Sequence, residues 1–196
     1  MFPLPEQVSH LIRHRRSVYP PQYSGQVVDR YVIEAMLENA NWAPTHARTE
    51  PWRFTVYTGD GLKQLAEFQS ELYRELSSQG GNFDEKKYYK LSQKPLQCSH
   101  VIAIGMRRDP KQRVPELEEV AATACAVQNM QLTAAAYGIG CYWGSGGITY
   151  WEEAKPFFGL APDDKLLGFL YVGVPKADPR AEGQRGDIDE KVTWVE

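Results

Sequence analysis

The feature that most limits how this chain can fold is the segment from Glu118 to Tyr137, which is apolar on nearly every side of a helix. A helix with apolar residues all round lies inside a structure, because a surface helix keeps one polar face. Gly138 and Gly140 follow and end the helix. We therefore expect other layers of the protein to surround it. Its apolar residues are Ala121, Ala122, Ala124, Val127, Met130, Leu132 and Ala135.

Three segments have the pattern of β-strands. Residues 101–104 and 166–174 are continuous apolar runs, which are typical of buried strands, and residues 52–57 alternate like a half-buried strand. At 196 residues with 42% hydrophobic content the chain can bury one sizeable core. Neither an internal repeat nor a Gly/Ser-rich linker divides it. The sequence predicts a single α/β or α+β domain over residues 1–196.

Four further helices are predicted. The first carries Val8, Leu11 and Ile12 and ends in the cationic run 13–17. A second begins after a capping Asp29 and stops before Pro44. A third runs from the turn at residues 59–61 to about Ser77, and a fourth is capped by Thr149 and reaches Phe158. The apolar face of the second helix consists of Val32, Ile33, Met36, Leu37 and Ala40.

Two segments look peripheral. Residues 79–95 are charged, aromatic and interrupted by glycine, a composition typical of a mobile surface segment, which could act as a lid. The tail, residues 175–196, is polar but ends on the apolar run 192–195. Such a run avoids water only by docking on something. We expect the tail to be an arm that lies across a partner subunit.

Charge and composition exclude several classes of protein. The formal net charge of −3 provides no overall basic field for nucleic acid or an anionic membrane. No apolar run is long enough for a membrane helix, and the N-terminus lacks the apolar core of a signal peptide. We expect a cytoplasmic protein. Cys98, Cys125 and Cys141 form no C-x-x-C pair and lie in apolar stretches, so buried free thiols are expected rather than disulfides or structural zinc.

Several standard catalytic and nucleotide-binding motifs are missing from the sequence. There is no G-x-G-x-x-G after a strand and no P-loop motif, so any nucleotide must bind by another route. A G-x-S-x-G nucleophile elbow fails because Trp143 stands where glycine is required. His10 and His14 are four residues apart, but no third metal ligand accompanies them. We expect neither a serine hydrolase nor a metal site.

Three segments remain as candidates for a binding site. Residues 15–17, Arg-Arg-Ser, offer the donors that a phosphate monoester needs, although they also fit an ordinary solvated helix end. His46 lies in a loop that can point into a cleft, or it can be a hydrogen-bonded loop histidine near Arg48 and Glu50, which can pair with each other. The glycines of residues 143–147 allow backbone N–H groups to approach a flat cofactor, or they form a plain turn.

Taken in order, these motifs resemble the nitroreductase superfamily, in particular its minimal bacterial branch of NAD(P)H nitroreductases. The order is R-R-S at 15–17, A-P-T-H at 43–46, E-P-W-R-F at 50–54, the Ala-rich helix ending Y-G-I-G at 140, and W-G-S-G at 143–146. The resemblance covers nearly the whole chain. It implies an α+β fold, a three-layer α-β-α sandwich with a mostly antiparallel central sheet and helices on both faces. It also implies a homodimer that exchanges the C-terminal arm.

The resemblance assigns roles to particular residues. The R-R-S element is similar to the family's grip on the FMN phosphate and ribityl chain, donated from the partner subunit, and Arg185 resembles a tail cation that completes this site. Residues 133–138 would lie near the nicotinamide nucleotide. The residues expected to bind FMN are Arg15, Arg16, Ser17, Trp42, His46, Trp143, Gly144, Ser145 and Arg185.

The implied activity is a ping-pong transfer of a hydride from NAD(P)H through flavin N5 to a small acceptor such as a nitroaromatic or a quinone. The cofactor carries the difficult chemistry, so no catalytic side chain is required. Arg48 and Glu50 depart from the residues that many relatives carry at these positions, which leaves the acceptor open. Reductive dehalogenation, a non-catalytic FMN module and a domain without flavin remain as alternatives.

Overall fold

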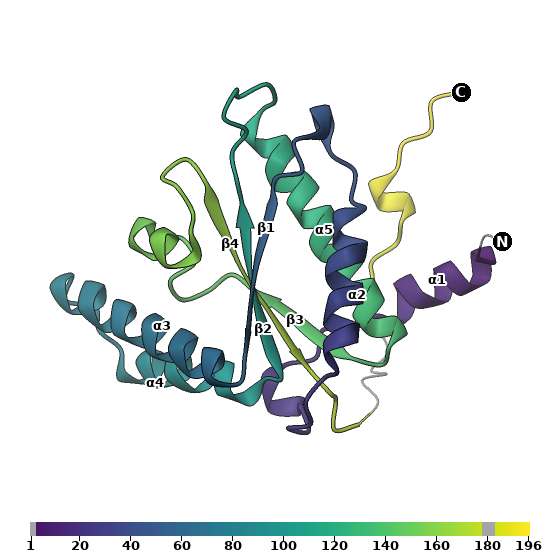
Figure 1. Cartoon of the computed structure of the whole chain (residues 1–196). Helices are drawn as coiled ribbons and strands as arrows, with labels where there is room; N and C mark the ends of the chain where they lie inside the picture. Colours follow the sequence, from purple (N-terminus) through teal and green to yellow (C-terminus); the bar gives the residue numbers. More distant parts are fainter. Residues whose placement is uncertain (1–2, 178–182) are drawn as a thin grey trace.

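An antiparallel sheet of four strands forms the centre of the protein (Figure 1). The computed structural model describes residues 3–177 and 183–196. The strand order is β1-β2-β4-β3, and all three neighbouring pairs are antiparallel. The strands are β1 (Trp52–Thr58), β2 (His100–Met106), β3 (Gly140–Gly144) and β4 (Lys165–Gly173).

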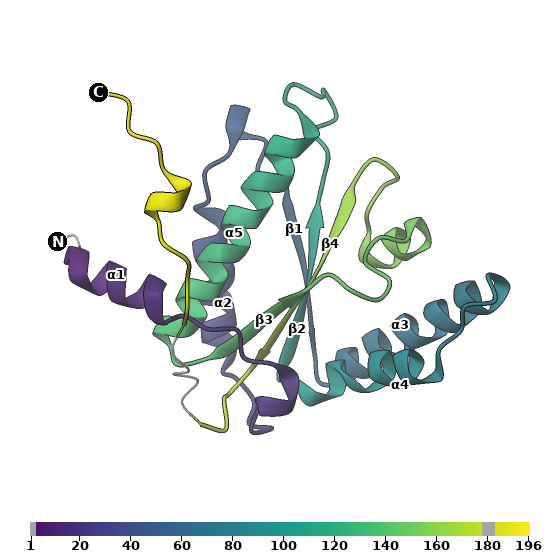
Figure 2. The same cartoon turned by 180° about the vertical axis from the view of Figure 1, so that it is seen from behind.

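Helices cover both faces of this sheet, as Figures 1 and 2 show from opposite sides. The expected three-layer α+β fold is confirmed. One outer layer contains α2 (Arg30–Asn41) and α5 (Glu116–Ala136), and the other contains α3 (Asp60–Gln79), α4 (Glu85–Gln93) and η4 (Glu152–Phe158). The helix α1 (Pro5–His14) contacts the end of α5. The short helical turns are η1 (Pro20–Gln22), η2 (His46–Arg48), η3 (Pro95–Gln97) and η5 (Asp189–Lys191).

Each face of the sheet has its own hydrophobic core. Met36 of α2 and Met130 of α5 pack with Leu170 on one face, and Leu65 of α3 packs with Phe169 on the other. Neighbouring residues of a strand point to opposite faces, so Phe169 and Leu170 serve different cores. Every residue of β2 is buried, which explains its continuous apolar run.

The helix α5 differs in one respect from the expectation that it lies wholly inside the structure. Met130 and Ala134 are fully buried, but Leu117 is 76% exposed and Cys125 is exposed as well. The prediction that all three thiols are buried is therefore wrong for Cys125, while Cys98 and Cys141 are buried. The physical reason is that α5 has a second apolar face, which no other part of the described chain covers.

The prediction of a mobile surface segment at residues 79–95 is wrong for most of its length. The segment folds as α4, whose first backbone amides donate hydrogen bonds to the Asp84 carboxylate. The helix packs on α3, where the Tyr88 hydroxyl donates to Glu71 at 2.8 Å. Leu91 is buried in the core on this face of the sheet. Tertiary contacts therefore stabilise a helix that is too polar to be recognised by its composition.

Three local predictions need correction. Residues 140–144 form β3, a strand that was not among the predicted elements. The helix expected from Thr149 begins at Glu152 and is a 3-10 helix, and the Thr149 hydroxyl donates to Gly146 O at 3.0 Å instead of capping it. Asp29 does precede α2, but its side chain makes no capping hydrogen bond.

The two ends of the chain extend beyond the α2–α5 layer on the same side (Figures 1 and 2). None of the residues of α1 is buried, and Trp194 and Val195 are 82% and 93% exposed in the described tail. Residues 178–182 of the expected arm lie outside the described part of the chain. Within residues 3–177 and 183–196, no helix combines the length and apolar character needed to cross a membrane.

Candidate active site

The end of α1 and the C-terminal tail bring three arginines together. Arg15 caps the C-terminus of α1, and Arg16 follows it. Burial lowers the pKa of Arg15, and the nearby guanidinium groups of Arg16 and Arg185 lower it further. The tail passes directly over Arg16, since a Cβ atom on Gly183 would lie 2.3 Å from its Nη2. Cations close enough to lower the pKa of a neighbour favour a bound anion.

Arg15 and Arg16 line a cavity of about 570 Å³ between α1, the end of α5 and the end of β4. Arg15, Arg16 and Lys176 contribute positive charge to its wall, and Ile139 and Val174 contribute apolar surface. No Asp or Glu of the described chain lines it. The expected phosphate site is therefore a cationic cavity rather than an isolated helix end.

The first residues after α1 are held against the sheet. Ser17 forms a bridge with Cys141 of β3, and the Val18 amide donates to Cys141 O at 3.0 Å. Gly140 is required at this point, because a Cβ atom there would lie 2.8 Å from Cβ of Val18. This pairing fixes Arg15, Arg16 and Ser17 at one end of β3.

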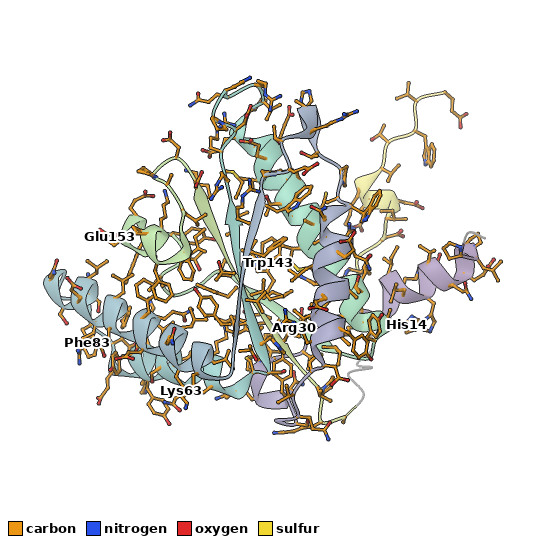
Figure 3. All side chains as sticks on the ribbon, in the orientation of Figure 1. His14, Arg30, Lys63, Phe83, Trp143 and Glu153 are labelled. Atoms are coloured by element: carbon orange, nitrogen blue, oxygen red, sulfur yellow. The ribbon has the colours of Figure 1, made fainter. Side chains whose placement is uncertain are left out.

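The other end of β3 carries the second expected group of residues. The Trp143 indole donates to Leu167 O at 3.0 Å, and its ring packs against the core beneath α2 and α5, where Figure 3 labels it. Ser145 is exposed, and Gly144 is buried. Gly168 has φ of 111° and lies so close that a Cβ atom would be 2.4 Å from Gly144 O. The buried end of the strand at Gly144 is thus closely packed against β4, and the exposed residues Ser145 and Gly146 follow it directly.

Lys94 is a candidate that the sequence analysis did not identify. Its ammonium lies over the rings of Tyr142 and Tyr171, at 4.7 and 3.9 Å from their centroids. A Cβ atom on Gly144 would be 3.3 Å from its Nζ. Burial, and then the charge of Lys90, lower the pKa of Lys94 to about 8. The sequence signal was weak, since Lys94 only follows a polar helix and precedes Pro95.

Trp42 and His46 lie along α5 rather than at β3. Trp42 is 78% exposed, its indole donates to Glu38 at 3.1 Å, and it lines a groove of about 410 Å³ with residues of α5. His46 is also exposed, and its Nδ1 lies 2.5 Å from Oε2 of Glu118. Within one described chain, these two aromatic side chains are therefore placed on the exposed side of the α2–α5 layer.

The loop after Trp42 has a strained backbone. Ala47, Arg48 and Glu50 have φ values of 50°, 52° and 43°, a region that residues other than glycine rarely adopt. The Thr45 hydroxyl holds the loop by contacting the Thr49 hydroxyl at 3.1 Å and accepting from the Glu50 amide. Among the described residues, the possible ion pair between Arg48 and Glu50 is not formed.

A comparison with models of known protein families identifies the family of this chain. The family model described as the nitroreductase family matches residues 12–174, which include both ends of β3 and the arginines after α1. The chain belongs to the nitroreductase family. The resemblance seen in the order of its motifs is confirmed, and the chain is an enzyme of the nitroreductase type.

Individual members of the nitroreductase family agree with this assignment. The Escherichia coli K12 protein named "Putative NAD(P)H nitroreductase YdjA" is 32% identical over 144 residues, which cover 74% of this chain and 76% of that protein. The crystal structure of a nitroreductase-like family protein from Bacillus cereus has a TM-score of 0.82 at 30% identity and covers all of both chains.

A more distant structure shows the same fold. It is a Desulfovibrio desulfuricans protein described as "a putative nitroreductase in complex with FMN", with a TM-score of 0.73 and 22% identity. The match covers 100% of this chain and 99% of that one. The three-layer architecture described above is therefore the fold of the nitroreductase family.

Proposed function

We propose that this nitroreductase binds FMN and uses it to pass electrons from NAD(P)H to a small acceptor such as a nitroaromatic or a quinone. The observation that carries the proposal is the group of Arg15, Arg16 and Arg185 beside a cavity that no carboxylate of the described residues lines. The FMN described for the Desulfovibrio desulfuricans structure and the NAD(P)H in the name of the Escherichia coli relative support it.

The residues present fit the phosphate of FMN. A phosphate monoester is close to dianionic at neutral pH and accepts several charge-assisted hydrogen bonds. Burial and mutual repulsion lower the pKa of Arg15, so the site disfavours its own positive charges until an anion binds. Arg15, Arg16 and Arg185 would hold the phosphate, and the exposed Ser17 hydroxyl would donate to it or to the ribityl chain.

The far end of β3 fits the flavin ring. Residues 144–146, Gly-Ser-Gly, present backbone without bulky side chains, and Trp143 beneath them is fixed by its bond to Leu167. Lys94 places a positive charge beside Gly144. A cation at this position would stabilise negative charge on the pyrimidine part of the ring. Positions along one strand would thus hold the phosphate and the ring at opposite ends.

We further propose that the site is completed in a homodimer of single-domain chains, residues 1–196, that exchange their C-terminal arms, residues 175–196. The exposed apolar face of α5 and the exposed Trp194 give each chain surface that a second copy would cover. Trp42 and His46 lie on this same side of the molecule, away from β3 of their own chain. They would therefore flank a flavin whose phosphate is held by the other subunit.

FMN, when bound, supplies hydride acceptance and donation. For a nitroaromatic the balanced two-electron reaction is ArNO₂ + NAD(P)H + H⁺ → ArNO + NAD(P)⁺ + H₂O, and a ping-pong order lets both substrates use one binding slot. The chain's contribution is to hold the ring and to order the slot above it. Residues 133–138, at the end of α5 beside the cationic cavity, would contact the nicotinamide nucleotide.

Spectroscopy and stopped-flow kinetics test this function. Purified protein should carry flavin absorbance or gain it when FMN is added. NAD(P)H should bleach that absorbance without an acceptor, and a quinone or nitroaromatic should restore it in a separate step. Protein that stays colourless with FMN contradicts the proposal. Flavin that binds but is not reduced indicates a non-catalytic module, and re-oxidation only by a halogenated phenol indicates a dehalogenase.

A further inference from the structure

A pocket of about 510 Å³ lies where η1, α4 and β3 meet. Its lining includes Tyr19 and the two prolines of η1, Tyr142 of β3, and the exposed Tyr89 and Lys90 of α4. Lys94 lies between this pocket and Gly144. The pocket therefore adjoins the strand end that we assign to the flavin ring.

The walls of this pocket suit a flat apolar group. The ring of Tyr19 lies 4.5 Å from that of Tyr142, tilted by 41°, and Tyr19 is 51% exposed. Tyr89 is 66% exposed at the rim. Stacking an aromatic ring on these exposed tyrosine surfaces is favourable, because it removes apolar area of both rings from water.

The charge of the pocket is entirely positive. Lys90 and Lys94 line it, and no Asp or Glu of the described chain does. They are four residues apart and share one face of the helical segment. Neither ammonium has an ion pair or a hydrogen bond in the described structure, whereas Lys63, Lys155 and Lys165 are all paired with carboxylates. The acid on α4, Glu85, lies at the start of the helix and outside the pocket.

We propose that this pocket selects an electron acceptor that joins an aromatic ring to a carboxylate, with Lys90 as the ion-pair partner of that carboxylate. Lys94 contacts the tyrosine rings and lies beside the flavin position, so the more exposed Lys90 pairs directly with the carboxylate, and the charge of Lys94 adds to the attraction from behind the rings. The acceptor's ring would stack on Tyr19 or Tyr89. This inference rests on the proposed function and names the substrate class of the same site.

Two acceptors of nearly equal shape test the inference. The flavin-loaded enzyme is assayed with 4-nitrobenzoate and with the neutral 4-nitrobenzamide, and the ratio of their kcat/KM values is recorded. We expect the wild-type ratio to exceed one, to fall about tenfold in Lys90→Ala and to fall further in Lys90→Glu, because a charge-assisted contact is lost or reversed. Lys90→Arg should retain most of the preference.

A variant on the same helix controls for long-range charge. Lys86→Glu makes the same charge change outside the pocket, and its ratio should stay within about twofold of wild type. Isothermal titration of 4-nitrobenzoate into the loaded enzyme, without NAD(P)H, provides a second measurement. Its Kd should rise about tenfold in Lys90→Ala, as the kinetic ratio falls.

The outcomes separate this inference from the proposed function. If the enzyme turns over both nitro compounds with a ratio near one that Lys90→Glu does not change, the pocket assignment is wrong and the proposed function stands. A rise in KM for NAD(P)H in Lys90→Ala, with the acceptor ratio unchanged, also overturns it, because Lys90 then serves the reductant. If the protein binds no FMN and oxidises no NAD(P)H, the proposed function itself is wrong.

Discussion

Apolar residues are buried in the sheet and its two covering layers. Along the outer edge, which α1 and the tail form, they are exposed. Leu65, Met130 and Leu170 are completely buried within their own chain, whereas Ile12 is 52% exposed and Trp194 is 82% exposed. Both regions contain large apolar side chains, and those of the outer edge stand among polar residues. The difference is that one region completes its packing alone and the other needs a second molecule.

The largest effect should come from damage to the self-sufficient region. Phe169 is 1% exposed and contacts Phe158 and Tyr171 across the core beneath α3. Phe169→Ala should lower the free energy of unfolding by about 4 kcal/mol, since it removes buried surface and leaves a cavity. Urea denaturation at low protein concentration measures this. Trp194→Ala should change the free energy of unfolding little under the same conditions, because its ring contacts little of its own chain. An equal loss of stability in the two variants would contradict the comparison.

The second effect concerns the outer edge. Truncation after Pro175 removes the arm and should weaken self-association by more than about a hundredfold while the circular dichroism of the sheet and helices is kept. Sedimentation velocity over a range of concentrations gives the association constant. Trp194→Ala should produce a smaller shift in the same direction. An intact truncated dimer would show that the face of α5, rather than the arm, accounts for the association.

The third effect links the two regions through the phosphate site. Arg16→Ala should weaken FMN binding roughly tenfold or more, because it removes charge-assisted hydrogen bonds to the phosphate. Fluorescence titration of FMN gives the dissociation constant. Arg13→Ala removes the same charge from the preceding turn, and Arg13 does not line the cavity, so its effect should be small. Equal losses of FMN affinity in the two variants would indicate that general positive charge, and not direct contact with the phosphate, accounts for the binding.

The elements that the sequence predicted correctly are those whose periodicity reflects burial within the chain. Residues 101–104 and 166–174 read as strands because β2 and β4 are buried on both faces, and α2 shows one apolar stripe because one core receives it. The helix α4 was missed because its stability comes from Asp84 and from contacts with α3. The strand β3 was missed because its five residues include two glycines and depend on pairing with β4.

The site shows the same division. Residues 15–17 and 143–145 could be singled out because motifs carry them, yet their placement at opposite ends of one strand appears only when Ser17 pairs with Cys141. The interaction of Arg185 with Arg15 depends on the path of the tail. Lys94 was missed because its role comes from its distance to Gly144, which lies fifty residues later in the chain.

The smallest effect is a change of pH dependence at Lys94. Burial lowers the pKa of its amine to about 8, so the ammonium is mostly present at pH 7 and is lost as the pH rises through 8. A bound anion stabilises the ammonium and raises this pKa. Affinity for 4-nitrobenzoate should therefore be constant below pH 7 and decline above about 8, by at most tenfold per pH unit for one proton.

The titration of Lys94 itself can be observed by NMR after reductive methylation with ¹³C-formaldehyde. The free protein should show a dimethylamine signal that titrates near 8 and is missing from Lys94→Gln, which distinguishes it from the N-terminal amine that titrates in the same range, and 4-nitrobenzoate should move its midpoint upward. Lys94→Gln should abolish the decline in affinity above pH 8, whereas Lys87→Gln, on the other side of α4 where its ammonium lies over Tyr73, should leave it in place. A midpoint that stays at 8 with the ligand bound would mean that the anion is held beyond the reach of Lys94. The positive end of the pocket would then belong to Lys90 alone, because the tyrosine rings would screen Lys94 from the acceptor.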